Sequence, residues 1–291
     1  MKTRQYPDLI AFVRAACTHA SHLDREVPLL PFYVREHPVG WLRPSFADLL
    51  RRWPHFFEIT GSFIILRATP DDVRGRTSAL AEVTHALEKE GVIRGWRDEP
   101  VSISHHYAAP ELVRIERAAT RHFGMMAYGA HLNGFTRRNG EPHLWIARRS
   151  AVKSVDPDRL DNLVGGRISC GYTVDETIRK EAWEEAGIPA TLMKGIACAS
   201  VVRVEYSVPE GLHREILFVH DLWLPEDFRP QNQDGEVARL YCLSIPETIE
   251  AILAGEFTLD AGAVTVDALL RNAVLAPEDP QYLDLVRLLR P

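Results

Sequence analysis

Three glutamates in one short segment are the residues whose types and spacing best suit chemistry. Glu181, Glu184 and Glu185 lie in a predicted helix over residues 173–186. At about 100° per residue, Glu181 and Glu185 share the apolar stripe that faces the core, and Glu184 borders it. That stripe is formed by Val174, Ile178 and Ala182. Carboxylates crowded beside a core lose solvation and repel one another, and a bound divalent cation removes both penalties. Because ligands made only of oxygen favour Mg²⁺ or Mn²⁺, we expect these glutamates to hold such an ion.

The same helix is also compatible with a solvated acidic face, on which Arg179 and Lys180 pair with carboxylates one turn away. The residues before the helix favour a ligand site. Gly165 and Gly166, followed by Gly171, predict a flexible loop, and glycines let a backbone approach a ligand closely. An ordinary tight turn would need the same glycines, so the loop supports the metal site without settling it.

Residues 165–189 resemble the Nudix box, G-x5-E-x7-R-E-U-x-E-E-x-G-U, in which U is aliphatic. Seven of the nine fixed positions match: Gly166, Glu181, Ala182, Glu184, Glu185, Gly187 and Ile188. Tyr172 stands where the box has Glu, and Lys180 stands where it has Arg. The resemblance implies a mixed-sheet α/β/α sandwich and a metal-dependent hydrolase that cleaves a diphosphate bond.

Three further segments, 39–59, 144–169 and 213–237, are similar to the thiamine-pyrophosphokinase-related Nudix proteins, which carry an extra N-terminal domain. This similarity covers the chain from about residue 30 to 275, and in that subgroup Lys commonly replaces the box Arg. The implied substrates are thiamine diphosphate or its damaged oxo forms, which would give the monophosphate and phosphate. A Nudix hydrolase of a nucleoside diphosphate derivative is an alternative.

The resemblance also suggests catalytic roles. Nudix enzymes usually take one more carboxylate from a later loop, and Glu236 in QDGEV is the best placed. We expect Glu236 and Glu184 to act in catalysis, with Glu236 as a metal ligand or general base. A plain turn residue after Asp234 and Gly235 is the alternative for Glu236.

The candidate substrate-binding residues are those whose side chains suit a phosphate or an aromatic ring. Basic side chains near the loop could bind phosphate or be solvated surface cations. Asn162 could touch substrate or hold the loop. Trp41, in an aromatic-rich stretch, could stack on an aromatic ring or belong to an ordinary core. The predicted substrate-binding residues are Trp41, Arg148, Arg149, Lys153, Asn162, Gly165 and Gly166.

Two other functions compete with hydrolysis. Isopentenyl diphosphate isomerisation needs a catalytic cysteine, and Cys170 lies in the box loop instead of on an expected strand. A non-catalytic Nudix-fold module that binds a diphosphate metabolite would explain Tyr172. Such a sensor would be free to lose its metal carboxylates, which this chain keeps.

Local patterns predict the elements that position these residues. We expect helices over 7–24 and 111–123, strands within 125–149, and strands and helices after the box. Strands interrupted by one strong helix indicate a mixed sheet with helices packed on it. The predicted fold is α/β (α+β), with an N-terminal accessory α+β domain over 1–112 and a Nudix domain with C-terminal helices over 113–291.

Composition limits the partners. The net charge is −6 with the signs interspersed, so nothing resembles the basic stripe that binds duplex nucleic acid. Since no run approaches the ~20 apolar residues of a membrane span, we expect no membrane partner. Four widely spaced cysteines fit a reducing cytoplasm. A homodimer is kept as an expectation.

Overall fold

The computed structural model describes residues 7–17, 29–153 and 155–290. Its centre is a seven-stranded mixed sheet, in which the strand order β11-β12-β7-β8-β13 is extended by β10 beside β7 and β9 beside β8. The strands are β7 (Ala127–Arg138), β8 (Glu141–Arg149), β9 (Leu160–Asn162), β10 (Val164–Arg167), β11 (Cys198–Val208), β12 (Gly211–Trp223) and β13 (Val237–Ser244). Strand β12 runs parallel to β7, and the other pairs are antiparallel.

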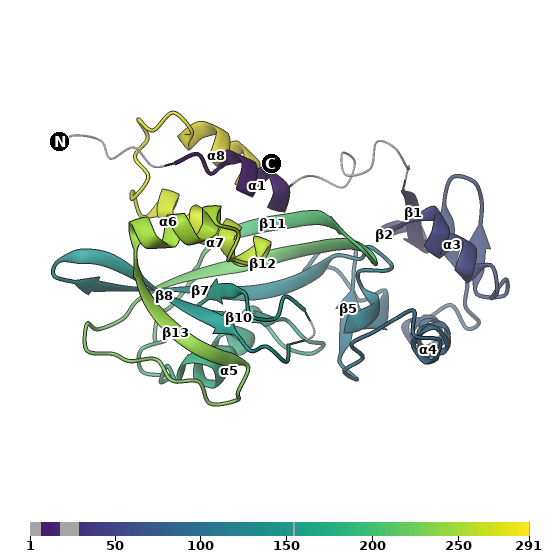
Figure 1. Ribbon diagram of the computed structural model, residues 1–291. Helices are drawn as coiled ribbons and strands as arrows, with labels where there is room; N and C mark the ends of the chain where they lie inside the picture. Colours follow the sequence, from purple (N-terminus) through teal and green to yellow (C-terminus); the bar gives the residue numbers. More distant parts are fainter. Residues whose placement is uncertain (1–6, 18–28, 154, 291) are drawn as a thin grey trace.

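Helices cover both faces of this sheet. Helix α5 (Val174–Ala186) packs on one face through an apolar cluster that includes Ile178 and Ala182. The opposite face is covered by α6 (Ile245–Leu253), α7 (Leu259–Arg271) and α8 (Tyr282–Leu289). Figure 1 shows α5 below the sheet and α6 to α8 above it. The predicted α/β/α sandwich is confirmed.

The first helix is shorter than predicted and packs elsewhere than expected. Helix α1 (Ile10–Ala16) ends well before residue 24, and residues 18–28 lie outside the described residues. Leu9 and Val13 are fully buried in the same core as α7 and α8. The Leu9 amide donates a hydrogen bond of 2.7 Å to the side chain of Gln281. This N-terminal segment therefore belongs to the core of the large sheet, although the predicted division at 112 assigns it to the accessory domain.

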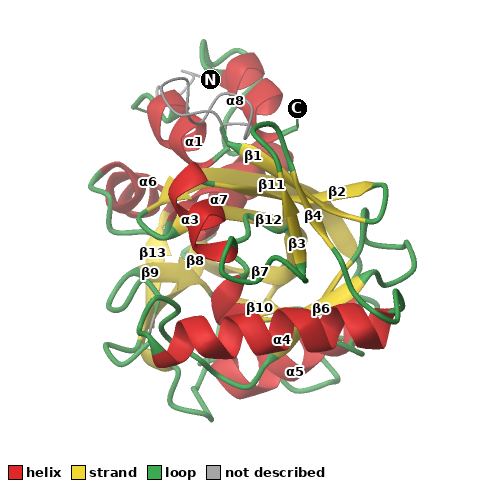
Figure 2. Ribbon diagram, turned by 90° about the vertical axis from the view of Figure 1, so that its right-hand side faces the viewer, coloured by secondary structure: helices red, strands yellow, loops and turns green. Residues whose placement is uncertain are grey.

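The remaining N-terminal residues form an α+β unit with its own core. Its four-stranded sheet has the order β2-β1-β4-β3, and β5 pairs with β6 in a separate ribbon. Figure 2 shows α4 crossing below these strands. The elements are β1 (Leu30–Val34), β2 (His37–Leu42), α3 (Pro44–Leu50), β3 (Phe57–Ile59), β4 (Ile64–Leu66), α4 (Val73–Lys89), β5 (Pro100–Ile103) and β6 (Val113–Glu116).

The predicted helix over 111–123 is wrong. Val113 and Ile115 are buried and Arg114 between them is exposed, which is the two-residue alternation of a strand. Strand β6 therefore forms here, followed by the short 3₁₀ helix η1 (Arg117–Ala119). Because β6 pairs with β5, the predicted boundary at 112 falls between two strands of one ribbon.

No helix in the described part of the chain is both long and apolar enough to cross a membrane.

Candidate active site

Helix α5 begins and ends where its sequence signals place it. The Thr173 hydroxyl accepts the Glu176 amide, and the Glu176 carboxylate accepts the Thr173 amide, which forms a capping box. Gly187 ends the helix in a left-handed conformation with φ 62°. Trp183 is 55% exposed on the outer face, so the helix has the predicted rotation.

Strand β10 holds the carboxylates of α5 through glycine backbone. The Gly165 amide donates to Glu185 Oε2 at 2.8 Å. A Cβ atom on Gly166 would lie only 2.3 Å from Glu181 Cγ, so a side chain there would displace Glu181. Gly165 and Gly166 therefore lie in a strand instead of in the predicted flexible loop, and the missing side chain of Gly166 lets β10 lie against Glu181.

Burial makes the charged forms of these carboxylates unfavourable. Burial raises the pKa of Glu185 well above its usual value, although the Gly165 amide and the nearby Lys153 oppose the rise. Burial also raises the pKa of Glu181, and the charges of Glu184 and Glu236 add to the rise. A cation placed among these groups would stabilise their charged forms.

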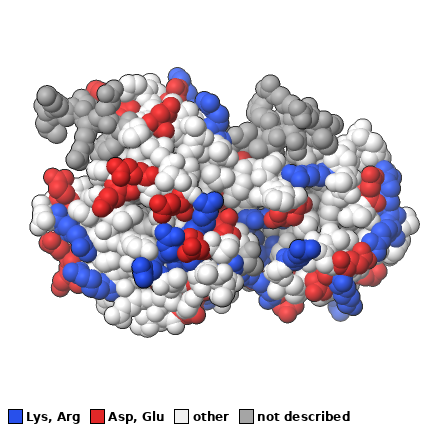
Figure 3. Space-filling model, in the orientation of Figure 1, with Lys and Arg blue, Asp and Glu red and all other residues white. Residues whose placement is uncertain are grey.

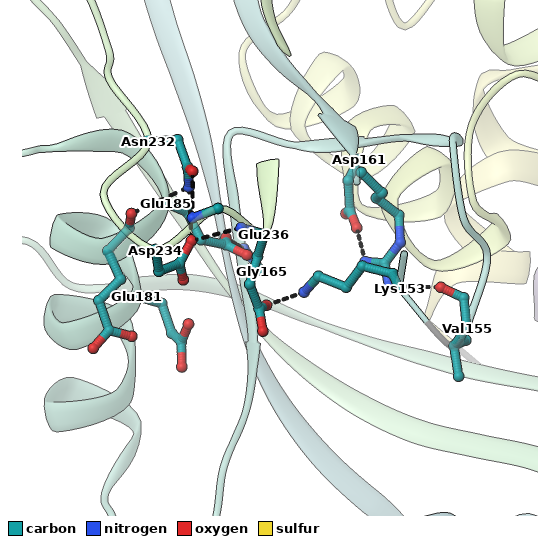
Figure 4. Close-up of polar contacts among 12 residues, drawn as sticks. Lys153, Val155, Asp161, Gly165, Glu181, Glu185, Asn232, Asp234 and Glu236 are labelled. Atoms are coloured by element: carbon teal, nitrogen blue, oxygen red, sulfur yellow. Dashed lines mark hydrogen bonds and ion pairs between the residues drawn. The ribbon is translucent and has the colours of Figure 1, made fainter. Parts of the chain in front are cut away.

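Lysines partly compensate the acidic group. Lys180 donates to Glu184 at 2.6 Å and to Glu181 at 3.3 Å. Burial opposes the charge on Lys180, but these hydrogen bonds outweigh burial and raise its pKa. Lys153 forms an ion pair with Glu236. Figure 4 shows Lys153 reaching Glu236, beside the helix that carries Glu181 and Glu185.

The loop before β13 is attached to the end of α5. The Gln233 amide donates to the Glu184 carbonyl at 2.7 Å. Asp234 Oδ1 accepts the amide of Glu236 at 2.8 Å and the side-chain amide of Asn232 at 2.7 Å. These bonds fix the loop that carries Glu236 beside the C-terminal end of α5.

A cleft of about 720 Å³ lies between the N-terminal unit and the large sheet. The N-terminal unit contributes four arginines and one glutamate to its lining: Arg94, Arg97, Arg117, Arg121 and Glu99. The opposite wall is acidic and includes Glu181, Glu184 and Glu236. Figure 3 shows basic and acidic side chains intermixed across the middle of the molecule. The cleft therefore has one cationic wall and one wall suited to cations.

The comparisons with known proteins agree with this site. Residues 10–127 match the model of a domain of unknown function (DUF4743), and residues 130–259 match the model of the NUDIX domain. Nudix hydrolase 24, chloroplastic, of Arabidopsis thaliana is 35% identical, over 97% of this chain and 78% of that protein. Nudix hydrolase 20, chloroplastic, of the same plant is 34% identical, over 90% of this chain and 72% of that protein.

The chain belongs to the Nudix hydrolase family.

Among solved structures, a protein from Deinococcus radiodurans is 24% identical, with a TM-score of 0.36, over 48% of this chain and 82% of that one. Nudix hydrolases are diphosphatases that generally use a divalent metal ion. The donor set here fits such an ion, because Glu181, Glu184, Glu185 and Glu236 offer only carboxylate oxygens.

Four of the predicted substrate-binding residues line the Nudix cleft: Arg149, Lys153, Gly165 and Gly166. Arg149 is already engaged in holding its own loop. It donates to Asp161 at 2.7 Å and to the carbonyls of Val155 and Asp156 at 2.8 and 3.0 Å. Lys153 is therefore the basic residue of this group best placed to exchange a carboxylate partner for phosphate.

The other three predictions of substrate contact are corrected. The Arg148 side chain lies on the face of β8 opposite to that of Arg149. There it donates to the Asp158 carbonyl at 2.7 Å and pairs with Glu256. Asn162 is 1% exposed and bonds to His131, Asn133 and Thr265, which makes it an internal structural residue.

Trp41 lies on β2 and is not among the cleft-lining residues. Its backbone amide bonds to the Phe123 carbonyl at 3.2 Å. The neighbouring aromatic residues Phe32 and Phe57 pack into the N-terminal core. Arginines, and not aromatic rings, therefore form the N-terminal wall of the cleft.

A second polar cluster in the cleft was missed by the sequence analysis. His213, Glu215 and Asp260 bring one ligand atom each within 4.8 Å of one another. Arg121 Nε donates to His213 Nδ1 at 3.2 Å, and His213 Nε2 lies 3.0 Å from Asp260 Oδ2. Arg167 pairs with Glu215 at 3.1 Å. Because two arginines already contact its ligand atoms, the cluster suits a polar wall of the cleft better than a metal site.

The three missed residues come from two separate elements, β12 and α7. Their sequence spacing therefore carries no motif. The alternation of His213 and Glu215 on one strand is the single local signal, and alternation predicts only a shared face.

Proposed function

We propose that this Nudix diphosphatase cleaves thiamine diphosphate or its damaged oxo forms, giving the monophosphate and phosphate, with Mg²⁺ or Mn²⁺. The observation that carries the proposal is the cleft, in which box glutamates face arginines of the N-terminal unit. The resemblance to the thiamine-pyrophosphokinase-related Nudix subgroup supports the choice of a thiamine diphosphate substrate.

The chain's own side chains supply most of the chemistry. Glu181, Glu184 and Glu185 would hold the ion from α5, and Glu236 would hold it from the opposing loop. When bound, the divalent ion neutralises phosphate oxygens and favours attack by water. Glu236, 41% exposed at its side chain, can accept a proton from that water. Lys153 can turn from Glu236 to a phosphate oxygen.

The competing functions gain little support. Cys170 is hydrogen-bonded to Glu111, and burial raises the pKa of its thiol, which disfavours the thiolate needed by an isomerase. Tyr172, which replaces the box Glu, is 49% exposed and lines the cleft. The carboxylates on α5 and on the loop before β13 are still present there. No specific observation therefore favours a metabolite sensor over a hydrolase.

A phosphate-release screen with Mg²⁺ tests the substrate. The panel contains thiamine diphosphate, its oxo form, ADP-ribose and nucleotide sugars, with products identified by chromatography. We expect the two thiamine compounds to be cleaved at least about ten-fold faster, in kcat/KM, than the others, which corresponds to about 1.4 kcal/mol. Preference for ADP-ribose would replace this proposal with the nucleoside diphosphate alternative.

Three further expectations remain predictions. We propose that the protein acts on a small molecule without nucleic acid, that it works in the cytoplasm, and that it forms a homodimer. The two plant relatives carry the word chloroplastic in their names, so location needs its own test by fluorescent tagging. Light scattering after size exclusion would measure the oligomeric state.

A further inference from the structure

The loop that joins β10 to α5, residues 168–173, is held by the N-terminal unit. Ser169 Oγ donates to Glu99 Oε1 at 2.8 Å. The Cys170 amide donates to the Pro100 carbonyl at 3.4 Å. Cys170 Sγ also lies 3.8 Å from Glu111 Oε2. A loop that belongs to the Nudix box is therefore bonded to a different folding unit.

Glu99 is itself a fixed group. Arg117 Nη1 donates to Glu99 Oε2 at 2.8 Å, on the carboxylate oxygen that Ser169 does not use. The backbone amides of Arg97 and Glu99 both donate to Glu116, which is 8% exposed. Burial raises the pKa of Glu99, but Arg117 and Ser169 outweigh burial and keep the pKa below its usual value. Glu99 is therefore an ionised acceptor with little freedom to move.

The far end of the same loop has a second attachment. Tyr107 of the N-terminal unit packs on two rings of the large sheet, with centroids 5.0 Å from Tyr128 and 4.8 Å from Phe218. Its hydroxyl also lies near the backbone of Val174, the first residue of α5. The N-terminal unit thus contacts the chain on both sides of the loop.

We propose that the N-terminal unit is a clamp for the Nudix loop and that Glu99 is its positioning residue. The clamp consists of Glu99, Pro100, Tyr107 and Glu111. The loop connects Gly166, which contacts Glu181, directly to the helix that carries the glutamates. A shift of the loop would move α5 relative to β10, and catalysis is sensitive to displacements of about 1 Å. The proposal rests on the diphosphatase activity and adds the residues that align it.

Ser169→Ala and Glu99→Ala test the clamp in the full-length protein. Neither variant changes a carboxylate that we assign to the metal. Ser169→Thr keeps the hydroxyl and is the conservative rescue. Glu90→Ala is the matched control, because Glu90 forms an ion pair with Arg52 in the same N-terminal unit and lies outside the cleft.

Two readouts are measured. For thiamine diphosphate with Mg²⁺, we expect Ser169→Ala and Glu99→Ala to lower kcat about ten-fold, as loss of an outer-shell partner often does. KM should stay within about two-fold, because the proposal gives Glu99 and Ser169 no contact with substrate although both line the cleft. Hydrogen exchange of amides 168–174 is measured in metal-free protein, and we expect it to become faster in both variants. Ser169→Thr and Glu90→Ala should behave as wild type in both assays.

Unchanged exchange in the loop with unchanged kcat overturns the clamp. A loss confined to KM also overturns it, since that result would make Glu99 a substrate ligand. An equal loss in Glu90→Ala would show general destabilisation and would count against it as well. If wild-type protein releases no phosphate from the screened diphosphates, the proposed substrate fails, and the exchange measurement still decides the clamp.

Discussion

The Gly165 amide lies 2.8 Å from Glu185 Oε2 and so joins strand β10 to the most deeply buried carboxylate of helix α5. One backbone hydrogen bond only partly offsets the burial of a charge, and the pKa of Glu185 remains raised. The residue is therefore poorly stabilised as an anion by the protein alone. A carboxylate that binds a metal ion is expected to behave in this way, because the cation then balances its negative charge.

Glu185→Gln should separate function from stability. We expect kcat to fall by at least about 100-fold, near 2.7 kcal/mol in the barrier, because a ligand charge is lost. A carboxyl with a raised folded-state pKa loses stability as pH rises from its unfolded pKa through its folded pKa. Removing that carboxyl should raise the melting temperature of metal-free protein at pH 7, by about 2–4 °C for each kcal/mol regained. Calorimetry in chelator checks the shift.

Glu181→Gln should show the same loss of kcat, because both carboxylates face the same site. Wild-type turnover in both variants would contradict the metal assignment. A melting temperature that falls in both would instead identify the two glutamates as structural residues.

Gly166→Ala should abolish activity while leaving the fold intact. Its new Cβ would meet Glu181 Cγ at 2.3 Å, so the flexible glutamate side chain would have to move away. We expect kcat to drop at least about 100-fold. Gly61→Ala is the control, since a Cβ there meets no atom within 4 Å. Normal turnover in Gly166→Ala would mean that the position of Glu181 does not matter.

Glu236→Gln should slow catalysis and weaken its dependence on Mg²⁺. The charge of Glu236 reaches Glu181, and the side chain lies beside Lys153 in the cleft. A fall of about 10²-fold is typical for loss of a general base. Glu226→Gln, in the same loop but outside the cleft, should be silent. If Glu236→Gln is silent and Glu176→Gln is inactive, the supporting carboxylate has been misassigned.

Trp41→Ala and Arg148→Ala should leave the KM values for thiamine diphosphate and for a ring-free diphosphate in the same ratio. Neither residue lines the cleft. Trp41→Ala should lower the melting temperature, because the N-terminal sheet loses packing. A several-fold rise in KM that is specific to the aromatic substrate would return Trp41 to the binding site.

Asp260→Asn should reduce stability at neutral pH. Burial raises the pKa of Asp260, but His213 and its other partners outweigh burial and hold the pKa far below its usual value. Such a group stabilises the fold above its unfolded pKa, and the contribution disappears only as pH falls through the lowered folded pKa. The difference in melting temperature between wild type and variant should therefore be present at pH 7 and shrink in strong acid. A difference independent of pH would contradict an Asp260 that is held ionised by its partners.

The local parts of the site could be predicted from sequence. Helical periodicity placed Glu181 and Glu185 on the core-facing side and Trp183 outside, and the structure confirms each. Arg148 was mispredicted because neighbours on a strand face opposite ways, and composition cannot show which of two arginines points inward. The wall of His213, Glu215 and Asp260 could not be predicted, since tertiary packing alone brings it together. The predicted helix over 111–123 is wrong because the apolar residues of this segment also fit the spacing of a helix.

The most direct test compares wild type with Glu185→Gln for Mg²⁺-dependent release of phosphate from thiamine diphosphate. The account predicts that wild-type protein forms the monophosphate and phosphate, that chelator stops the reaction, and that the variant is folded and at least about 100-fold slower. Equal rates in the two proteins, or a rate indifferent to chelator, would contradict it.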